Sequence, residues 1–328
     1  MRTVRASFVL VALLLAVTAC AGGGRPVDLA NVTSVNRPTP VGVEENPPAS
    51  SGTSAPAPDC DPKASYRPDD SLPPAGQMPA RSTMRAIQDR GQLIAGVDQN
   101  TFLFGFRNPT TNALEGFDIE IVRELAKAVF GDPNKVRFKV VTSAGRVKAL
   151  QDGDVDVVVR TMTATCDRWK DINFSAIYYT AGQRLLVDRA SKVTRLDQLG
   201  GRKVCAAKGS TSVKTIAANP AKLIPVQVDN WSDCLIMLQQ GQVEAVSTDD
   251  TILAGMVAQD PNVKLAGPRF TEEPYGIGIP KANVDMVRFV NGVLAQSIAD
   301  GTWAKSYDRW LGATGEPRPE PPTPVYRD

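Results

Sequence analysis

Hydrophobic positions between residues 92 and 247 alternate between a strand pattern and a helix pattern. The clearest helix is predicted over residues 116–130, where Phe117, Ile121 and Leu125 share a face and Gly131 ends the helix. Strands are predicted at 92–97, 136–141, 155–159, 203–207, 224–228 and 244–247, and further helices at 146–151, 212–218 and 232–239. Strands that alternate with helices predict an α/β fold with parallel sheets covered on both faces.

One segment of this pattern occurs twice. Residues 150–158 have the sequence LQDGDVDVV, and residues 238–246 have the sequence LQQGQVEAV. Each predicts a helix end, a glycine turn and a buried strand, and each strand runs into polar residues. Ligands of open α/β sheets bind beyond the carboxyl ends of strands, so the repeat predicts a cleft between two lobes. The alternative is that Leu-Gln-x-Gly is merely a common way to end a helix.

Both ends of the chain differ from this central part. Residues 1–19 have two arginines, a ten-residue apolar run and the sequence VTAC, which resembles the lipobox of bacterial lipoproteins. We therefore predict a signal peptide and an acylated Cys20 as a membrane anchor; an ordinary signal peptide is the alternative. Residues 20–80 are rich in proline without periodicity and predict a tether, and residues 313–328 predict an extended tail.

Composition excludes several kinds of chemistry. The chain has 37 Lys and Arg against 35 Asp and Glu, without the basic stripe of a nucleic-acid-binding protein. It has no histidine, the commonest general base and metal ligand. In an exported protein, Cys60, Cys166, Cys205 and Cys234 predict two disulfides, with three possible pairings. Their spacing does not suit zinc, and we expect neither a metal nor a cofactor.

Several motifs match one known family. Residues 91–311 resemble the glutamine-, glutamate- and aspartate-binding proteins of bacterial ABC importers. The resemblance rests on these segments, which keep their order along the chain: LIAGVD (93–98), GFDI (116–119), ALQDGDVD (149–156), TMT (161–163), NFS (173–175), GSTS (209–212), TDD (248–250), PYGI (274–277) and DGTW (300–303).

The resemblance implies a two-lobed periplasmic-binding-protein-like fold of type II. Lobe 1 would comprise residues 84–182 plus 275–312, and lobe 2 residues 185–273. Two crossing strands between the lobes would form a hinge. On this division Cys205 pairs with Cys234, and Cys60 pairs with Cys166, which joins the tether to lobe 1. A hinged cleft also favours a monomer.

The same resemblance assigns the groups that would hold a free amino acid. Arg168 takes the position of the arginine that grips the α-carboxylate. Thr161, Thr163 and Thr211 would donate further hydrogen bonds to the ligand, and Asp249 would accept from its ammonium. The alternatives are that Arg168 merely pairs with its surface neighbour Asp167, and that Asp249 caps the following helix.

Side-chain selectivity is assigned less clearly. Arg146 and Ser143 stand where glutamate and aspartate binders hold the distal carboxylate. Asp98 stands where glutamine binders accept from the amide; alternatively, it orients Arg146. Arg160 adds a cation near the cleft, unless it is a solvated side chain at a strand end. These residues predict a preference for glutamate or aspartate over their amides.

Two aromatic residues are candidates for contact with the ligand. Phe104 lies near the position of the aromatic that such proteins stack on the ligand, where Thr101 itself aligns. Trp231 falls in lobe 2, opposite, and is either a lid or a packing residue.

These observations predict a binding protein rather than an enzyme. The protein would capture a polar amino acid at the outer face of the cytoplasmic membrane and deliver it to an ABC permease. An alternative is an amino-acid sensor that signals to a transmembrane partner. A prephenate-type dehydratase is a third hypothesis, but no pair of carboxylates has a telling spacing.

Overall fold

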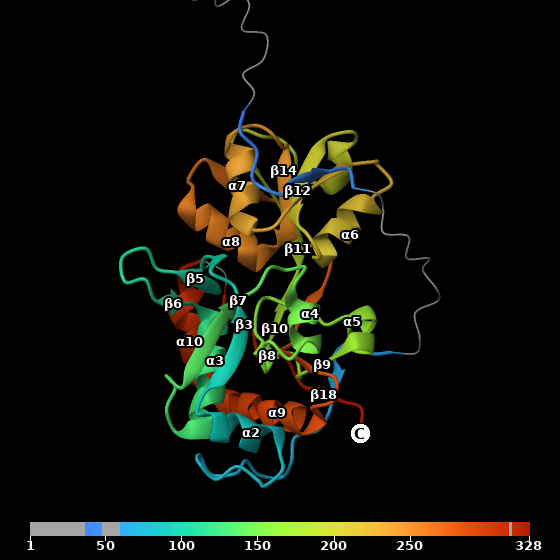
Figure 1. Cartoon of the computed structure of the whole chain (residues 1–328). Coiled ribbons are helices and arrows are strands. Elements are labelled where there is room, and N and C mark those ends of the chain that lie inside the picture. The colour runs from blue at the N-terminus through green and yellow to red at the C-terminus, as the bar shows by residue number, and fades with distance from the viewer. Residues whose placement is uncertain (1–36, 48–59, 315–316) are drawn as a thin grey trace, which may run out of the picture. The chain divides into compact units, whose positions relative to one another are not determined.

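The structure is a computed structural model that describes residues 37–47, 60–314 and 317–328 of the 328-residue chain. The chain from Thr39 to Asp328 forms one compact unit. Inside this unit two sheets, each with its own hydrophobic core, define two lobes (Figure 1). The prediction of a two-lobed α/β fold is therefore confirmed.

Lobe 1 is built on a five-stranded sheet. Its strands, in spatial order, are β7 (Val136–Val140), β3 (Leu93–Val97), β8 (Val157–Val158), β17 (Gly278–Pro280) and β9 (Ile172–Phe174). A small three-stranded sheet adds β4 (Asn100–Thr101), β5 (Gly105–Arg107) and β6 (Leu114–Glu115). Its helices are α2 (Thr83–Arg90), α3 (Phe117–Phe130), α4 (Arg146–Gln151), α5 (Cys166–Asp171), α9 (Val284–Ala299) and α10 (Thr302–Trp310).

Helix α3 shows how the sequence pattern becomes packing in this lobe. Phe117, Ile121, Leu125 and Val129 are all buried, and Gly131 ends the helix in the left-handed conformation. The apolar stripe predicted for this helix therefore faces the core, because removal of apolar side chains from water is the main driving force for packing.

Lobe 2 is built on a six-stranded sheet. Its strands, in spatial order, are β1 (Glu44–Glu45), β13 (Ile224–Val228), β12 (Lys203–Ala207), β14 (Ala245–Asp249), β11 (Gln183–Asp188) and β15 (Val263–Ala266). Its α-helices are α6 (Thr211–Ala217), α7 (Trp231–Gln239) and α8 (Asp250–Gln259), and short 3-10 turns lie at Leu196–Leu199 here and at Gly312–Thr314 in lobe 1.

Two antiparallel strands carry the chain between the lobes. β10 (Tyr179–Ala181) pairs with β16 (Glu273–Tyr275) in a two-stranded sheet of its own. The prediction of parallel sheets holds for three neighbouring strands in each lobe, whereas antiparallel strands complete both sheets. Strands such as β11 and β17 enter a lobe from the crossing segment and run against the parallel strands.

The repeated segment has the same local structure in both lobes. Gly153 and Gly241 both take positive φ, at 71° and 65°. The N–H of Asp154 donates to the carbonyl of Ala149, and that of Gln242 donates to Met237 in the same way. Strands β8 and β14 follow these turns, so the polar residues after each strand take corresponding places in the two lobes.

Much of the region predicted as a tether is part of the folded unit. Glu44 and Glu45 pair with the edge strand β13 and form ion pairs with Lys208 (2.8 Å) and Lys203 (2.7 Å). Residues 60–80 pack on lobe 1, where the hydroxyl of the fully buried Ser65 donates to the carbonyl of Phe174. Two-residue strands leave no periodicity in a sequence, which is why the pattern indicated disorder there.

The C-terminal tail is extended, as predicted, but it is docked on lobe 1. β18 (Val325–Tyr326) pairs with β2 (Ala64–Ser65). The guanidinium of Arg327 lies 3.8 Å from the centroid of the Trp169 ring, and Asp328 forms an ion pair with Arg288. The N- and C-terminal segments thus stabilise each other on the same lobe.

Two disulfides join the four cysteines in the pairing that the resemblance implies, Cys60 to Cys166 and Cys205 to Cys234. The signal peptide and Cys20 lie outside the described residues. Within the described part of the chain, no helix is long and apolar enough to cross a membrane.

Candidate functional site

A small enclosed cavity lies between the ends of the parallel strands of the two lobes. Its residues come from both lobes: Ser143, Arg146, Thr161, Thr163, Ser210, Thr211, Ser212, Trp231, Thr248, Asp249 and Ile252. The cavity encloses about 10 Å³. That is the room of roughly one water molecule, so a larger solute can enter only if the lobes part.

Asp249 ends strand β14 and supplies an acceptor to this cavity. Its Oδ2 accepts from the hydroxyl of Tyr275 at 2.6 Å, while Oδ1 is buried and has no hydrogen-bond partner among the described residues. Asp249 is also the N-cap residue of helix α8, as the alternative predicted, but its side chain makes no capping hydrogen bond to that helix. A buried carboxylate oxygen without a partner is costly, and a cationic donor would satisfy it.

The electrostatic surroundings of Asp249 disfavour its ionised form. Burial raises the pKa of this carboxyl to about 8, and the carboxylates of Glu273 and Asp250 act in the same direction. The hydrogen bond from Tyr275 and the charge of Arg146 act against the shift. An ammonium group beside Asp249 would therefore restore the ionised carboxylate.

Arg146 begins helix α4 and brings a buried cation to the same cavity. Its Nε donates to the carbonyl of Ser143 (3.0 Å), and its Nη1 donates to the carbonyls of Arg160 (3.1 Å) and Thr161 (3.2 Å). It has no carboxylate within ion-pair distance in the described chain. Burial, reinforced by Arg168 and Arg160, lowers its pKa well below the ordinary value. Because a guanidinium stays protonated in proteins, the cavity offers a positive charge that lacks a counter-ion.

Asp98 is fully engaged by the protein and does not orient Arg146. Its carboxylate forms an ion pair with Arg160 at 2.8 Å, and both side chains are buried. It also accepts from the amides of Gln99 and Asn100 and from the hydroxyl of Thr101. The interpretation of Asp98 as a partner of Arg146 is therefore wrong, and few acceptor positions remain for a ligand amide.

Arg160 is a structural cation rather than a solvated one. It is 1% exposed, and its Nη1 donates to the hydroxyl oxygen of Ser143 at 2.6 Å. The alternative of a solvated side chain is thus wrong, and Arg160 does not line the cavity. Its charge is neutralised by Asp98, which leaves Arg146 as the cation that faces the enclosed space.

Arg168 joins the lobes beside the cavity instead of lining it. Its Nη1 donates to the carbonyl of Thr163 in lobe 1 (2.6 Å), and its Nη2 donates to the carbonyl of Gly209 in lobe 2 (3.0 Å). Asp167 pairs with Lys170 and Lys214, so the interpretation of an Arg168–Asp167 surface pair is wrong. Burial lowers the pKa of Arg168, and the charges of Glu273 and Asp249 oppose that shift.

The three predicted threonines all line the cavity. Thr161 has a φ of 38°, unusual for a β-branched residue, and its N–H donates to Asp118 at 2.9 Å. The hydroxyls of Thr163 and Thr211 both donate to Glu273, at 2.7 Å and 2.9 Å. Sequence reasoning missed Glu273, since a glutamate before a proline in a crossing strand carries no local signal for a site.

The two aromatic candidates have different environments. Phe104 is fully buried in the core of lobe 1, with edge contacts to Phe117, Tyr179 and Tyr275. It does not line the enclosed cavity, so its contact with a ligand stays a prediction. Trp231 does line the cavity, and its buried Nε1 has no partner among the described residues. The cavity therefore contains an unsatisfied indole donor in addition to the cation of Arg146.

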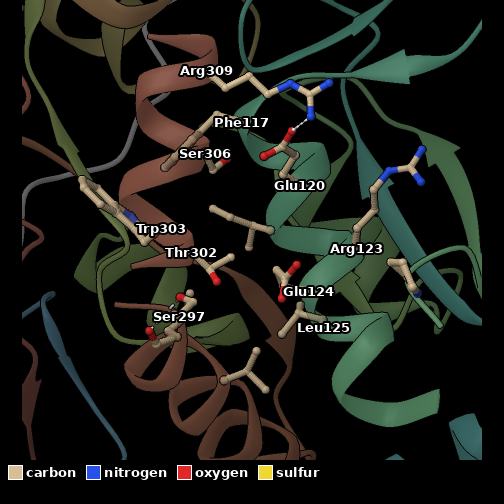
Figure 2. Close-up of a pocket in the computed structure, with 14 residues that line it drawn as sticks. Phe117, Glu120, Arg123, Glu124, Leu125, Ser297, Thr302, Trp303, Ser306 and Arg309 are labelled. Carbon is tan, nitrogen blue, oxygen red and sulfur yellow. Dashed lines mark hydrogen bonds and ion pairs between the residues drawn. The ribbon is translucent and has the colours of Figure 1, made fainter. Parts of the chain in front are cut away.

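A larger groove of about 270 Å³ lies elsewhere on lobe 1, between helices α3, α9 and α10 (Figure 2). Its floor is largely apolar, and Glu120 at its edge pairs with Arg309 at 2.9 Å. None of the residues predicted to hold a ligand lines this groove. The enclosed cavity is the better candidate site, because it lies between the lobes and contains a buried carboxylate oxygen and an indole N–H that lack partners among the described residues. In the groove, the hydroxyl of Ser306 is the buried polar atom in that position.

The fold and this cavity define a class of protein. Two lobes joined by two crossing strands, with polar groups from both lobes around a closed space, are the architecture of a two-lobed solute-binding protein. The chain belongs to the bacterial extracellular solute-binding proteins, family 3, whose sequence model matches residues 93–313. Members of this family are extracellular proteins that bind solutes.

Several known proteins are similar to this chain. The ABC transporter glutamine-binding protein GlnH of Bacillus subtilis (strain 168) is 40% identical over 232 residues, which cover 70% of this chain and 85% of GlnH. A glutamine-binding protein of Geobacillus stearothermophilus is 42% identical over 201 residues, which cover 61% of this chain and 77% of that protein. The structure of an ancestral arginine-binding protein bound to glutamine has 37% identity and a TM-score of 0.62, and the match covers 68% of this chain and 99% of that one.

Proposed function

We propose that this protein captures an acidic amino acid, L-glutamate or L-aspartate, between its lobes and delivers it to an ABC permease. The relatives named above bind glutamine or belong to ABC transporters, which supports a polar amino acid as the ligand and a permease as the partner. The choice of an acidic ligand depends on the unsatisfied groups of the cavity.

Those groups match the two ends of an acidic amino acid. Asp249 Oδ1 is an acceptor without a donor among the described residues and suits the α-ammonium. Trp231 Nε1 is a donor without an acceptor, and Arg146 is a buried cation without a carboxylate in the described chain. A distal carboxylate satisfies both donors and supplies the missing counter-ion, whereas an amide supplies no charge. The buried Arg146 is the observation that carries this proposal.

Glutamine is the second candidate ligand, because two of the relatives named above are glutamine-binding proteins. A glutamine side chain would place its carbonyl on Arg146 or Trp231. Its amide group would then need an acceptor, and the carboxylate of Asp98 already accepts from four protein donors. An unpaired buried amide is costly, so we expect glutamine to bind more weakly than glutamate.

Calorimetry of the full chain with glutamate, aspartate, glutamine and asparagine tests the choice of ligand. We expect glutamate or aspartate to bind at least about tenfold more tightly than its amide. Arg146→Met should weaken acidic ligands by about a hundredfold and amides by only a few fold. The matched control is Arg123→Met, which removes an arginine that does not line the cavity. Tighter binding of glutamine, with equal losses for both ligands in Arg146→Met, would replace the acidic ligand by the amide.

We also propose that Cys20 is acylated and anchors the protein at the outer face of the cytoplasmic membrane. Support comes from the VTAC sequence after a short apolar run and from a family of extracellular binding proteins. Cys20→Ala should move the protein from the membrane fraction to the soluble extracellular fraction. Retention of the variant in the membrane fraction would contradict the anchor.

A further inference from the structure

Glu273 is a buried carboxylate that bonds to both lobes. It lies at the start of the crossing strand β16 and is 4% exposed. Its Oε2 accepts from the hydroxyl of Thr163 in lobe 1 at 2.7 Å and from the hydroxyl of Thr211 in lobe 2 at 2.9 Å. Its Oε1 accepts from the hydroxyl of Thr271 at 2.8 Å. One side chain thus joins the two lobes through charge-assisted hydrogen bonds.

This bridge forms part of the wall of the candidate site. Thr163 and Thr211 line the enclosed cavity on one side and an open groove of about 320 Å³ on the other. Glu273 lines the open groove but not the enclosed cavity. The three side chains therefore separate the cavity from the outside. Arg168 extends the same wall, since its guanidinium also spans the lobes, from Thr163 to Gly209.

The two lobes also approach each other closely at two further places. A Cβ atom added to Gly209 would lie 2.6 Å from the Cα of Ala144, and one added to Gly255 would lie 2.5 Å from the carbonyl oxygen of Phe102. Both pairs join lobe 1 to lobe 2. The hydrogen bonds of Glu273 therefore belong to a closed arrangement in which backbones of the two lobes are in contact.

We propose that Glu273 is an internal carboxylate that competes with the ligand. In the closed arrangement it occupies the hydroxyls of Thr163 and Thr211. If the protein binds an amino acid as proposed, these hydroxyls are donors that the family resemblance assigns to the ligand. The carboxylate of an arriving ligand must displace the Glu273 carboxylate from these two hydroxyls and from its position near the positive charge of Arg168. Glu273 thus lowers the affinity for the ligand and contributes to selectivity, because a solute without a carboxylate has nothing to exchange for it.

The bridge itself is tested in the protein without added ligand. Glu273→Gln removes the charge at nearly constant size. Its matched control is Glu272→Gln, which removes a neighbouring carboxylate that is 61% exposed and pairs only at 3.4 Å with Lys63. By hydrogen–deuterium exchange of the full chain, we expect amides near Gly209 and Thr211 to exchange about tenfold faster in Glu273→Gln than in the control. Equal exchange in both variants would overturn the bridge.

A second variant keeps this result independent of a local folding defect. Thr211→Val removes the lobe 2 hydroxyl that donates to Glu273. If the two residues act as one bridge, the double variant exchanges no faster than the faster single variant. If instead the increases in exchange rate of the two single variants multiply in the double variant, the two residues act independently, and the proposal is overturned.

The competition is tested by calorimetry with L-glutamate and L-glutamine. We expect Glu273→Gln to bind whichever of them the wild type prefers about tenfold more tightly, with Glu272→Gln unchanged. Unchanged or weaker binding would mean that Glu273 supports the ligand-bound form, and would overturn the proposal. A wild-type chain that binds neither amino acid would refute the proposed function instead, while the exchange experiment would still decide whether Glu273 joins the lobes.

Discussion

The carboxyl of Asp249 should make ligand binding depend strongly on pH. Burial raises its pKa to about 8, so below that pH most molecules carry a protonated Asp249. An ammonium bound at Oδ1 requires the ionised form, and its charge lowers the pKa in the complex. Binding near neutral pH must therefore release a proton from Asp249. Other charged groups act on this carboxyl as well: Glu273 and Asp250 raise the pKa, while Arg146 and the hydroxyl of Tyr275 lower it.

The size of this effect follows from proton linkage. When the free protein has a pKa of about 8 and the complex has one below 6, the fraction of ionised Asp249 in the free protein sets the affinity. That fraction rises about 50-fold from pH 6 to pH 8, so Kd should fall by about 50-fold over the same interval. The ligand ammonium stays protonated throughout, so it adds no slope of its own.

Calorimetry at pH 6, 7 and 8, in buffers with different heats of ionisation, measures both Kd and the number of protons released. We expect close to one proton released at pH 7 and a fall in Kd as the pH rises. Asp249→Asn should bind weakly and without this pH dependence. A Kd that stays constant between pH 6 and 8, with no proton release in the wild type, would refute a buried acceptor with a raised pKa.

Three further variants test other parts of the structure. Gly255→Ala places a Cβ 2.5 Å from the carbonyl oxygen of Phe102 in the other lobe, so we expect calorimetry to show about tenfold weaker ligand binding. The Tm should be unchanged or higher, since alanine favours the helix. Equal affinity would contradict the close approach of the lobes. Asp98→Asn leaves the buried Arg160 without its counter-ion, so it should lower the free energy of unfolding, measured in urea, by about 3–5 kcal/mol. A change below about 1 kcal/mol would mean that the ion pair is not buried in solution. Cys60→Ser removes a disulfide that spans 106 residues, so it should lower the free energy of unfolding by about 4 kcal/mol. Hydrogen exchange should show that lobe 2 stays folded. An unchanged urea midpoint would show that the N-terminal segment does not stabilise lobe 1.

The sequence alone determined the regular elements and the class of fold. Helix α4 and strands β12 and β13 have the predicted bounds, because their apolar periods and glycine turns are local features. It also predicted that Thr161 and Asp249 take corresponding places after the repeated strands of the two lobes, beside the cleft, since the segment before each strand is repeated. The two-residue strands β1 and β2 escaped prediction, because their pairing with distant segments leaves no local pattern.

Only the tertiary structure decided how the charges are shared. The family resemblance places Asp98, Arg146, Arg160 and Arg168 near the cleft but does not say which of these charged groups pair with one another. In the fold, Asp98 pairs with Arg160 and leaves Arg146 without a carboxylate partner in the described chain. Glu273 became part of the site for the same reason, because a crossing strand brings it between hydroxyls that are 48 positions apart along the chain (211 − 163 = 48). Ion pairing and hydrogen bonding depend on distance in space, and only the folded chain sets those distances.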